Sequence, residues 1–536
     1  MGIFAYMPYG AGGIIIRVEA DIRRGIPGVD ISGLAEGAVR EARDRVRAAF
    51  RNSGFSFPLD RILINLAPAG LKKDGAALDL PIALSVMAAA GTAPVSGNLL
   101  VMGELELSGK IRPVRGVLAA IAAGLSEGIT EFIVPAENSG EAAILVEKGA
   151  VFTAAENLQG AVHALFIRAG NGKLPASLRT EASGDAYGAG VNSAEGGYTG
   201  GDFSEVRGQA VYKRALEIAA AGGHNVLVFG PPGAGKTMLA RRMTSIMTAL
   251  TPDEAVEVTR LYSLAGPFSN SGDCCSQRFI DRLITNAPFR APHHSASAEG
   301  ILGGGRNPRP GEISLAHFGV LFLDEAPEFR INVLQALREP LEDRVISISR
   351  AEGPVRFPAE FQLLMTANSC PCGRLGMRET ENGCLCSPEE INRYWRKFGG
   401  ALLDRVEIRV AVLPPKISEI GKHSGCSEEE SAEIAGRVRA TVEIQRQRFK
   451  ETAVRRNALL PAGKTASLCP MSEKAEKAFH TAVSKLGFSG RAFHGILRVA
   501  RTIADLESKE IIETEHILEA VHYRRLGEDP WEILSI

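Results

Sequence analysis

The sequence lacks an excess of charge of either sign. It carries 61 Lys and Arg residues against 62 Asp and Glu residues, so the formal net charge is −1. Proteins that coat nucleic acid with a large basic surface are much more positive than this. The balance excludes a strongly basic coat protein, but it leaves room for a local basic surface.

The sequence also lacks long apolar runs, a leader pattern and a dense set of cysteines. No stretch reaches the ~18 uninterrupted apolar residues that a membrane span needs. Residues 1–13 do not follow the charged-then-apolar pattern of a signal peptide. Eight cysteines in 536 residues are too few for the disulfide framework of a small secreted protein. We therefore expect a soluble cytoplasmic protein with no membrane partner.

A chain of 536 residues is too long for one hydrophobic core, and about three domains are expected. The clearest boundary is a stretch rich in Gly, Ser, Ala and Asn that has no apolar periodicity. The predicted division is an α+β domain at 1–167, a flexible linker at 168–204, an α/β core at 205–415 and a helical C-terminal domain at 416–536.

Apolar periodicity predicts the local structure before the linker. Strand patterns occupy residues 13–25, 61–70 and 131–138, and helical patterns occupy residues 35–51, 78–91 and 116–128. A hairpin turning at Ser108 and Gly109 is expected between them. After the linker, a helix is expected from 211, a buried strand at 224–230 and a helix at 238–247.

A phosphate-binding loop is the strongest local signal. The motif G-x-x-x-x-G-K-[ST] follows a predicted strand and precedes a predicted helix, which is the context that it requires. Glycines let backbone N–H groups converge on a polyphosphate, Lys236 reaches its oxygens, and the hydroxyl of Thr237 can bind Mg²⁺. The nucleotide-binding residues are Gly230, Pro231, Pro232, Gly233, Ala234, Gly235, Lys236, Thr237 and Met238.

Two later strands end in polar residues that suit the same chemistry. Four apolar residues at 320–323 precede Asp324, which would hold the Mg²⁺ shell, and Glu325, which would deprotonate the attacking water. The strand at 362–367 precedes Asn368, which could hydrogen-bond the γ-phosphate or the attacking water. The alternatives are an acidic helix cap for the carboxylates and a turn residue for Asn368.

These three strand ends, in this order, resemble the Walker A, Walker B and sensor 1 elements of AAA+ ATPases. More narrowly, the chain resembles the magnesium-chelatase-like group and within it the ComM/YifB family. The segments that carry the narrower resemblance are 289–295, 303–314, 323–329 and 370–373. The resemblance covers nearly the whole chain and implies a multidomain α/β fold, with ATP and Mg²⁺ as ligands and a C-terminal helical lid.

The resemblance also implies an active site shared between subunits. Residues 402–405 match the arginine-finger helix, so Arg405 would reach the ATP of a neighbouring subunit in a hexameric ring. Residues 489–491 match the sensor 2 position, so Arg491 would touch the γ-phosphate in cis or in trans. Arg498, on the same predicted helix, is a competing assignment. An ordinary surface arginine is the alternative for Arg405.

The family places two pore elements in segments that are long or hairpin-like here. One is an insertion at 266–316, in which His293, His294, Arg290, Arg306 and Arg309 occur. The other is a hairpin at 345–361 that precedes sensor 1. Contact with a nucleic-acid backbone is one interpretation of the arginines and glycines, and an ordered loop with hydrogen-bonded histidines is the other.

Two C-x-C pairs bracket a polar loop after sensor 1. Cys370 and Cys372 precede Cys384 and Cys386 by eleven intervening residues, and four thiolates fit a tetrahedral Zn²⁺ site. The C-x-C spacing is tighter than the usual C-x₂₋₄-C, so four free thiols are the alternative. We predict a structural zinc ion, because it would order a loop that has no core of its own.

The N-terminal domain resembles Lon-type proteases within a fold like that of ribosomal protein S5 domain 2. The segment 72–81 matches the catalytic turn, but Ala77 stands where the nucleophilic serine is expected. The segment 103–116 follows the Lon pattern, and the residues after it, 117–121, lack the matching lysine. Since both members of the dyad are absent, we predict no peptidase activity.

The resemblance implies an ATP-driven ring motor on DNA, a helicase or translocase that migrates branches during recombination of incoming DNA in natural transformation. The alternative is a protein-remodelling ATPase of the chelatase kind that acts on a partner protein. Arginines and glycines in the insertion, with few aromatic residues, favour branched or single-stranded DNA as the partner.

Overall fold

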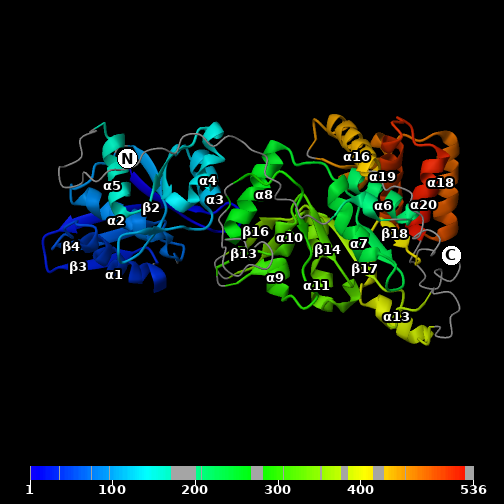
Figure 1. Cartoon of the computed structure of the whole chain (residues 1–536), viewed down its shortest axis with the longest axis horizontal. Helices are drawn as coiled ribbons and strands as arrows, with labels where there is room; N and C mark the ends of the chain where they lie inside the picture. Colours follow the sequence, from blue (N-terminus) through cyan, green and yellow to red (C-terminus); the bar gives the residue numbers. More distant parts are fainter. Residues whose placement is uncertain are drawn as a thin grey trace.

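The computed structural model describes residues 2–34, 37–73, 75–95, 97–170, 201–206, 208–266, 280, 282–305, 307–350, 353–375, 384–414, 428–452 and 454–525. The described chain is elongated, with an N-terminal domain at one end and a larger body at the other (Figure 1). No helix among these residues is both long enough and apolar enough to cross a membrane.

The N-terminal domain is built on a seven-stranded sheet in the order β3-β4-β2-β1-β5-β8-β9. The strands are β1 (Gly2–Met7), β2 (Ile14–Arg23), β3 (Gly28–Ser32), β4 (Arg61–Ala67), β5 (Asn98–Val101), β8 (Glu131–Pro135) and β9 (Val151–Ala155). The predicted strands at 13–25, 61–70 and 131–138 correspond to β2, β4 and β8. Strand β1 was not predicted, although it lies in the middle of the sheet, antiparallel to β2 and parallel to β5.

Five helices of the described residues accompany this sheet: α1 (Gly37–Asn52), α2 (Asp79–Ala89), α3 (Val117–Ser126), α4 (Ser139–Ala143) and α5 (Leu158–Arg168). Helix α1 buries Val39, Ala42, Val46, Ala49 and Phe50, which recur every three or four residues as an amphipathic helix requires. The predicted hairpin forms between β6 (Glu104–Leu105) and β7 (Ile111–Arg112).

The predicted linker lies largely outside the described residues, which omit 171–200. Helix α5 continues to Arg168, and Phe203 is fully buried in the core that follows. Phe203, which falls within the predicted linker, therefore packs with the core. A single aromatic side chain at the end of a Gly-rich stretch gives little periodic signal.

The core contains a five-stranded sheet in the order β11-β14-β17-β10-β18. Its strands are β10 (Val226–Phe229), β11 (Phe289–Arg290), β14 (Val320–Leu323), β17 (Gln362–Ala367) and β18 (Ile408–Ala411). All neighbouring pairs are parallel, and β10, β14 and β17 are buried along their whole length. Because they run the same way, the segments that follow β10, β14 and β17 meet at one edge of the sheet.

Helices and two short hairpins surround this sheet. The helices are α6 (Ala210–Gly222), α7 (Lys236–Arg241), α8 (Pro252–Ala265), α9 (Ala298–Leu302), α10 (Glu312–Leu315), α11 (Ile331–Ala336), α12 (Arg338–Asp343), α13 (Pro388–Arg396) and α14 (Gly400–Leu403). The hairpins are β12 (Gly303–Gly304) with β13 (Arg309–Pro310), and β15 (Val345–Ile348) with β16 (Val355–Pro358). The second is the hairpin predicted before sensor 1. Helix α7 is shorter than predicted, because a 3₁₀ turn replaces it from Arg242.

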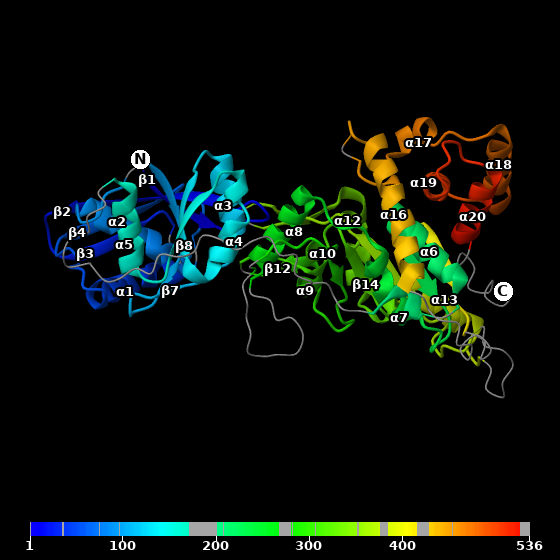
Figure 2. The same ribbon diagram turned by 45° about the horizontal axis from the view of Figure 1, so that its top comes forward.

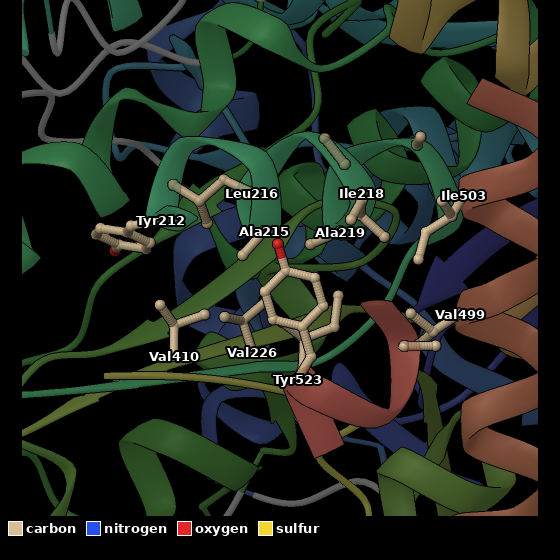
Figure 3. Close-up of a cluster of buried hydrophobic side chains, with 14 of the residues drawn as sticks. Tyr212, Ala215, Leu216, Ile218, Ala219, Val226, Val410, Val499, Ile503 and Tyr523 are labelled. Atoms are coloured by element: carbon tan, nitrogen blue, oxygen red, sulfur yellow. The ribbon is translucent and has the colours of Figure 1, made fainter. Parts of the chain in front are cut away.

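The C-terminal residues are helical and pack closely on the core. They form α16 (Glu428–Arg448), α17 (Ala462–Leu468), α18 (Glu473–Leu486), α19 (Gly490–Leu506) and α20 (Thr514–Arg525). Figure 3 shows side chains of α6 and β10 meeting Val499 and Ile503 of α19 and Tyr523 of α20. One continuous apolar cluster therefore joins these helices to the sheet, so the C-terminal helices and the core form one packed body.

The N-terminal domain packs on helix α8 and on hairpin β15–β16. Leu264 of α8 is buried in the same apolar cluster as Tyr6 and Val114. The backbone N–H of Ala11 donates to the carbonyl of Arg356 over 3.2 Å. Both views show α8 on the side of the core that faces the N-terminal domain, with α18 and α20 at the far end (Figures 1 and 2).

Candidate nucleotide-binding site

The loop between β10 and α7 makes a close turn over the end of the sheet. Gly230 has a φ of +159°, and a Cβ atom there would lie 2.0 Å from the carbonyl oxygen of Val412. No residue with a side chain fits at this position without moving strand β18's continuation. Ala234 is buried, and its carbonyl accepts a hydrogen bond from Gln209 over 3.2 Å. These contacts hold the loop against the end of the sheet, and its glycines allow the close approach of a polyphosphate to the backbone.

Lys236 is the buried cation at the centre of the site. Its ammonium donates to the carbonyls of Gly230 and Pro231, each over 2.8 Å, and to Oδ1 of Asn368 over 3.3 Å. Burial lowers the pKa of Lys236, while the nearby carboxylates of Asp324 and Glu325 act in the opposite direction. The ammonium is held only by neutral oxygen acceptors, so a polyphosphate at this place would compensate its charge.

Thr237 and Asp324 meet as a pair suited to Mg²⁺. The hydroxyl of Thr237 donates to Asp324 at 3.0 Å from Oδ1 and 3.1 Å from Oδ2. Thr366, on β17, donates to the same Oδ1 over 2.5 Å. A hydroxyl and a carboxylate side by side are oxygen ligands of the kind that Mg²⁺ takes, so the donor set fits that ion.

Glu325 is exposed beside this pair, in a left-handed backbone conformation with φ of +50°. Its N–H donates to Oγ1 of Thr366 over 3.0 Å, which fixes the turn. Asn368 follows β17, and its N–H donates to the hydroxyl of Tyr394 over 3.2 Å. The structure thus brings together Lys236, Thr237, Asp324, Glu325 and Asn368 from three strand ends.

The remaining predicted loop residues surround that group. Pro232 lies against the turn that contains Gly373, and Met238 is 44% exposed at the start of α7. Sequence reasoning missed the residues that support the loop from outside: Gln209, Tyr212, Thr366 and Tyr394. The hydroxyl of Tyr212, for example, donates to the carbonyl of Lys236 over 3.0 Å. No spacing signal links these residues to the motifs, since only the fold brings them near.

Arg405 and Arg491 lie together, away from the phosphate-binding loop. Arg405 forms an ion pair of 2.8 Å with Glu342 of α12, and Arg491 forms a short ion pair with the same carboxylate. The carbonyl of Arg405 accepts from Asn225, which precedes β10. Arg405 therefore lies at the start of the strands and the loop lies at their end, separated by about 13 Å of four-residue strand.

Arg498 occupies a different environment from Arg491. Arg491 is exposed, whereas burial lowers the pKa of Arg498, with the nearby carboxylate of Glu407 opposing that change. Of the two competing sensor 2 residues, Arg491 is the more exposed.

The four predicted zinc ligands form a compact cluster. The sulfurs of Cys370, Cys372, Cys384 and Cys386 all lie within 4.8 Å of one another. Three pairs are 3.3 Å, 3.6 Å and 3.6 Å apart, all close to the ~3.8 Å that zinc–sulfur bonds of about 2.3 Å imply for a tetrahedron. All four thiols are free, so this donor set fits Zn²⁺. Cys274, Cys275 and Cys426 lie outside the described residues.

The insertion differs in part from expectation. Arg290, for which contact with a nucleic-acid phosphate was one of two interpretations, forms a two-pronged ion pair with Glu312 at 2.6 Å and 2.7 Å. The rings of His293 and His294 stack with centroids 4.1 Å apart. Arg309 is exposed on β13, and Arg306 lies outside the described residues. Of the described arginines in this group, Arg309 has an exposed side chain.

The positions of the missing protease dyad lie in one apolar cluster. Leu118, in the segment that lacks the lysine, is fully buried, and Ala77 packs against the same cluster. A hydrocarbon core at this place offers no nucleophile and no base.

Comparisons with known proteins cover almost the whole chain. Residues 18–138 match the family described as subunit ChlI of Mg-chelatase, residues 202–420 match magnesium chelatase, subunit ChlI, and residues 428–524 match its C-terminal region. The chain is 39% identical to competence protein ComM of Haemophilus influenzae over 98% of this chain and 97% of that protein. It is 38% identical to YifB of Escherichia coli, an uncharacterized protein, over 95% of this chain and 94% of that protein.

The N-terminal part has a second similarity. It is 28% identical to a Lon protease of Salinispora arenicola over 136 residues, which are 24% of this chain and 18% of that enzyme. The match supports the expected Lon-like character of the first domain at the level of sequence.

Proposed function

This chain belongs to the ComM/YifB family of magnesium-chelatase-like AAA+ proteins, and on that basis we propose that it is an ATP-hydrolysing ring motor that acts on DNA. The observation that carries the ATPase part is the convergence of Lys236, Thr237, Asp324 and Asn368 at one sheet edge. We also propose that the chain is divided into the four predicted parts, that a helical lid follows residue 416, and that the protein is cytoplasmic.

Each residue of the site has a role in this proposal. The loop 230–238 holds the phosphates of ATP, and Lys236 turns from its carbonyl partners toward them. Thr237 and Asp324 hold Mg²⁺, which supplies charge neutralisation on the phosphate oxygens. Glu325 accepts the proton of the attacking water, and Asn368 orients that water. Thr366 fixes Asp324 and the N–H of Glu325 at once.

Arg405 and Arg491 serve the site of a neighbouring subunit. Arg405 lies at the edge of the sheet opposite its own loop, and Arg491 shares its partner Glu342. Both guanidinium groups therefore act in trans, which requires a closed ring, and the family resemblance implies a hexamer. Glu342 holds the two arginines in place until a nucleotide of the next subunit competes for them.

DNA is the proposed substrate. The H. influenzae relative is named a competence protein, and exposed arginines on β13 and β16 suit contact with phosphates. The specific activity proposed is branch migration, by helicase or translocase action, during recombination of incoming DNA. The alternative is a protein-remodelling ATPase, for which the magnesium-chelatase relationship is the supporting observation.

We also propose that the protein binds a structural Zn²⁺ ion. Cys370, Cys372, Cys384 and Cys386 would bind it as thiolates, and their spacing in the fold suits a closed four-sulfur site.

Binding of forked DNA to the purified full chain tests the choice of substrate. The Glu325→Gln variant is mixed with ATP and labelled forked DNA, and binding is measured by fluorescence anisotropy. The affinity for DNA should fall steeply with added salt, because phosphate contacts release counterions. An Arg309→Ala variant should bind more weakly, and an Arg61→Ala variant should not, since Arg61 pairs with Asp30 in the N-terminal domain. Absence of binding at low salt would favour the protein-remodelling alternative.

A further inference from the structure

The cysteine cluster lies directly behind the nucleotide-binding site. Cys370 is two residues after Asn368, whose Oδ1 accepts from the ammonium of Lys236. The only residue between them, Ser369, is buried, and its carbonyl accepts from Nε1 of Trp395 over 3.1 Å. A ligand held by Cys370 would therefore fix the backbone on which Asn368 stands.

The same cluster also touches the phosphate-binding loop. Gly373, in the turn after Cys372, has a φ of +76°, and a Cβ there would lie 2.9 Å from Cδ of Pro232. The turn itself is stabilised by the N–H of Leu375, which donates to Sγ of Cys370 over 3.4 Å. No space separates the cysteine turn from the loop that holds the nucleotide.

The second cysteine pair leads into the helix that supports Asn368. Cys386 precedes Ser387, which caps α13 by accepting from the N–H of Glu390. Helix α13 carries Tyr394, the partner of the Asn368 N–H, and Trp395, the partner of the Ser369 carbonyl. An ion bound to both pairs would tie the end of β17 to the start of α13, and Asn368 is held from both.

We propose that a zinc ion bound by Cys370, Cys372, Cys384 and Cys386 positions Asn368 and the phosphate-binding loop, so that ATP hydrolysis depends on the metal. This inference rests on the proposed ATPase function. The cysteines are positioning residues, since they act through Asn368 and Pro232 and touch no reacting atom. Metal loss should therefore lower kcat with the fold retained.

The test compares a Cys372→Ser variant with a Cys469→Ser control. Cys372 is an exposed member of the cluster, whereas Cys469 is a buried thiol in the apolar cluster shared by core and lid. Wild type and control should each contain about one zinc per chain, and Cys372→Ser should contain little. We expect kcat of Cys372→Ser to fall at least ~10-fold, while circular dichroism shows the same helix content as wild type.

A double-mutant cycle separates positioning from general damage. In an Asn368→Ala background, Cys372→Ser should lower kcat by a clearly smaller factor than in the wild-type background, because only the part of the effect that acts through the phosphate-binding loop remains. A Gly373→Ala variant, which keeps all four ligands, should retain zinc and bind a fluorescent non-hydrolysable ATP analogue more weakly, since its methyl group collides with Pro232.

Three results would overturn the inference: a zinc-free wild type, a zinc-depleted Cys372→Ser variant with kcat within ~2-fold of wild type, or an equal loss of kcat in both backgrounds. Failure of the proposed ATPase function would give another result: the wild type would contain zinc and hydrolyse no ATP. That result would also overturn the inference, which rests on the ATPase function.

Discussion

Arg405 forms an ion pair of 2.8 Å with Glu342 at the edge of the core sheet that lies opposite the phosphate-binding loop. Arg491, from a helix almost ninety residues later in the chain, reaches the same carboxylate. One glutamate thus gathers two arginines. In the proposed ring, they would meet the nucleotide of a neighbouring subunit.

Replacement of Arg405 by Ala should abolish hydrolysis and preserve ATP binding. A trans arginine is worth about 10³–10⁵ in rate in related NTPases, so we expect a loss of at least ~100-fold in kcat. Mixing Arg405→Ala with Lys236→Ala subunits should restore part of the activity, because each supplies what the other lacks. If Arg405 served its own subunit, mixing the two variants would restore no ATPase activity. Arg393→Ala is the control variant, because Arg393 is an exposed arginine of α13.

Arg491→Ala and Arg498→Ala should have opposite signatures. The first removes an exposed guanidinium, so kcat should fall about 10-fold with an unchanged melting temperature. The second removes one of the two cations near Glu407, Arg498, and leaves Arg524, while burial already raises the pKa of that carboxyl. Arg498→Ala should therefore melt several degrees lower. Thermal unfolding and steady-state hydrolysis of both variants check this, and a reversed pattern would assign sensor 2 to Arg498.

Burial of Glu141 beside Ser263 of α8 should make the stability of the domain junction depend on pH. Glu141 accepts from the N–H of Leu118 over 2.8 Å, from Asn138 over 3.1 Å and from the hydroxyl of Ser263 on α8. Burial raises the pKa of Glu141 above its usual range. The folded state therefore holds a proton more tightly than the unfolded state does, and this contribution to stability is present at low pH and lost as pH rises.

A Glu141→Gln variant cannot lose that proton. The melting temperature of the wild type relative to the variant should decline as pH rises above the usual titration range of a glutamate, while an exposed control, Glu147→Gln, should stay parallel to the wild type. Curves for wild type and Glu141→Gln that run parallel over this range would show that Glu141 has an ordinary pKa.

The N-terminal domain should show no peptidase activity. Ala77 and the buried Leu118 pack in one apolar cluster where a Ser–Lys dyad would be needed. An unfolded protein substrate should remain intact with wild type and with Ala77→Ser, because a serine alone lacks its base. Leu118→Lys should lower the melting temperature, since it buries an unpaired charge. Cleavage by the wild type that a serine-directed inhibitor blocks would contradict this account.

Contiguous motifs were predictable, and long-range partners were not. Residue type and spacing alone identify three features: the loop at 230–237, the carboxylates after β14 and the four cysteines. Glu342, Thr366 and Tyr394 became visible only through the fold, because their partners are between 26 and 149 residues away. The ion pair between Arg290 and Glu312 could not be predicted either, since no sequence pattern links the two residues.

Strand β1 shows why a sheet can be harder to predict than a loop. It is six residues long, and only pairing with β2 and β5 on both sides fixes it as a strand. Short apolar segments do not distinguish a central strand from a loop that packs on the core.

The ATPase rate with and without forked or Holliday-junction DNA tests the central claim most directly. The wild type should hydrolyse ATP at least ~10-fold faster when the DNA is present, and Glu325→Gln should bind the same DNA without hydrolysis, because it lacks the base that activates water. An ATPase rate that DNA leaves unchanged, together with no DNA binding at low salt, would contradict a DNA motor.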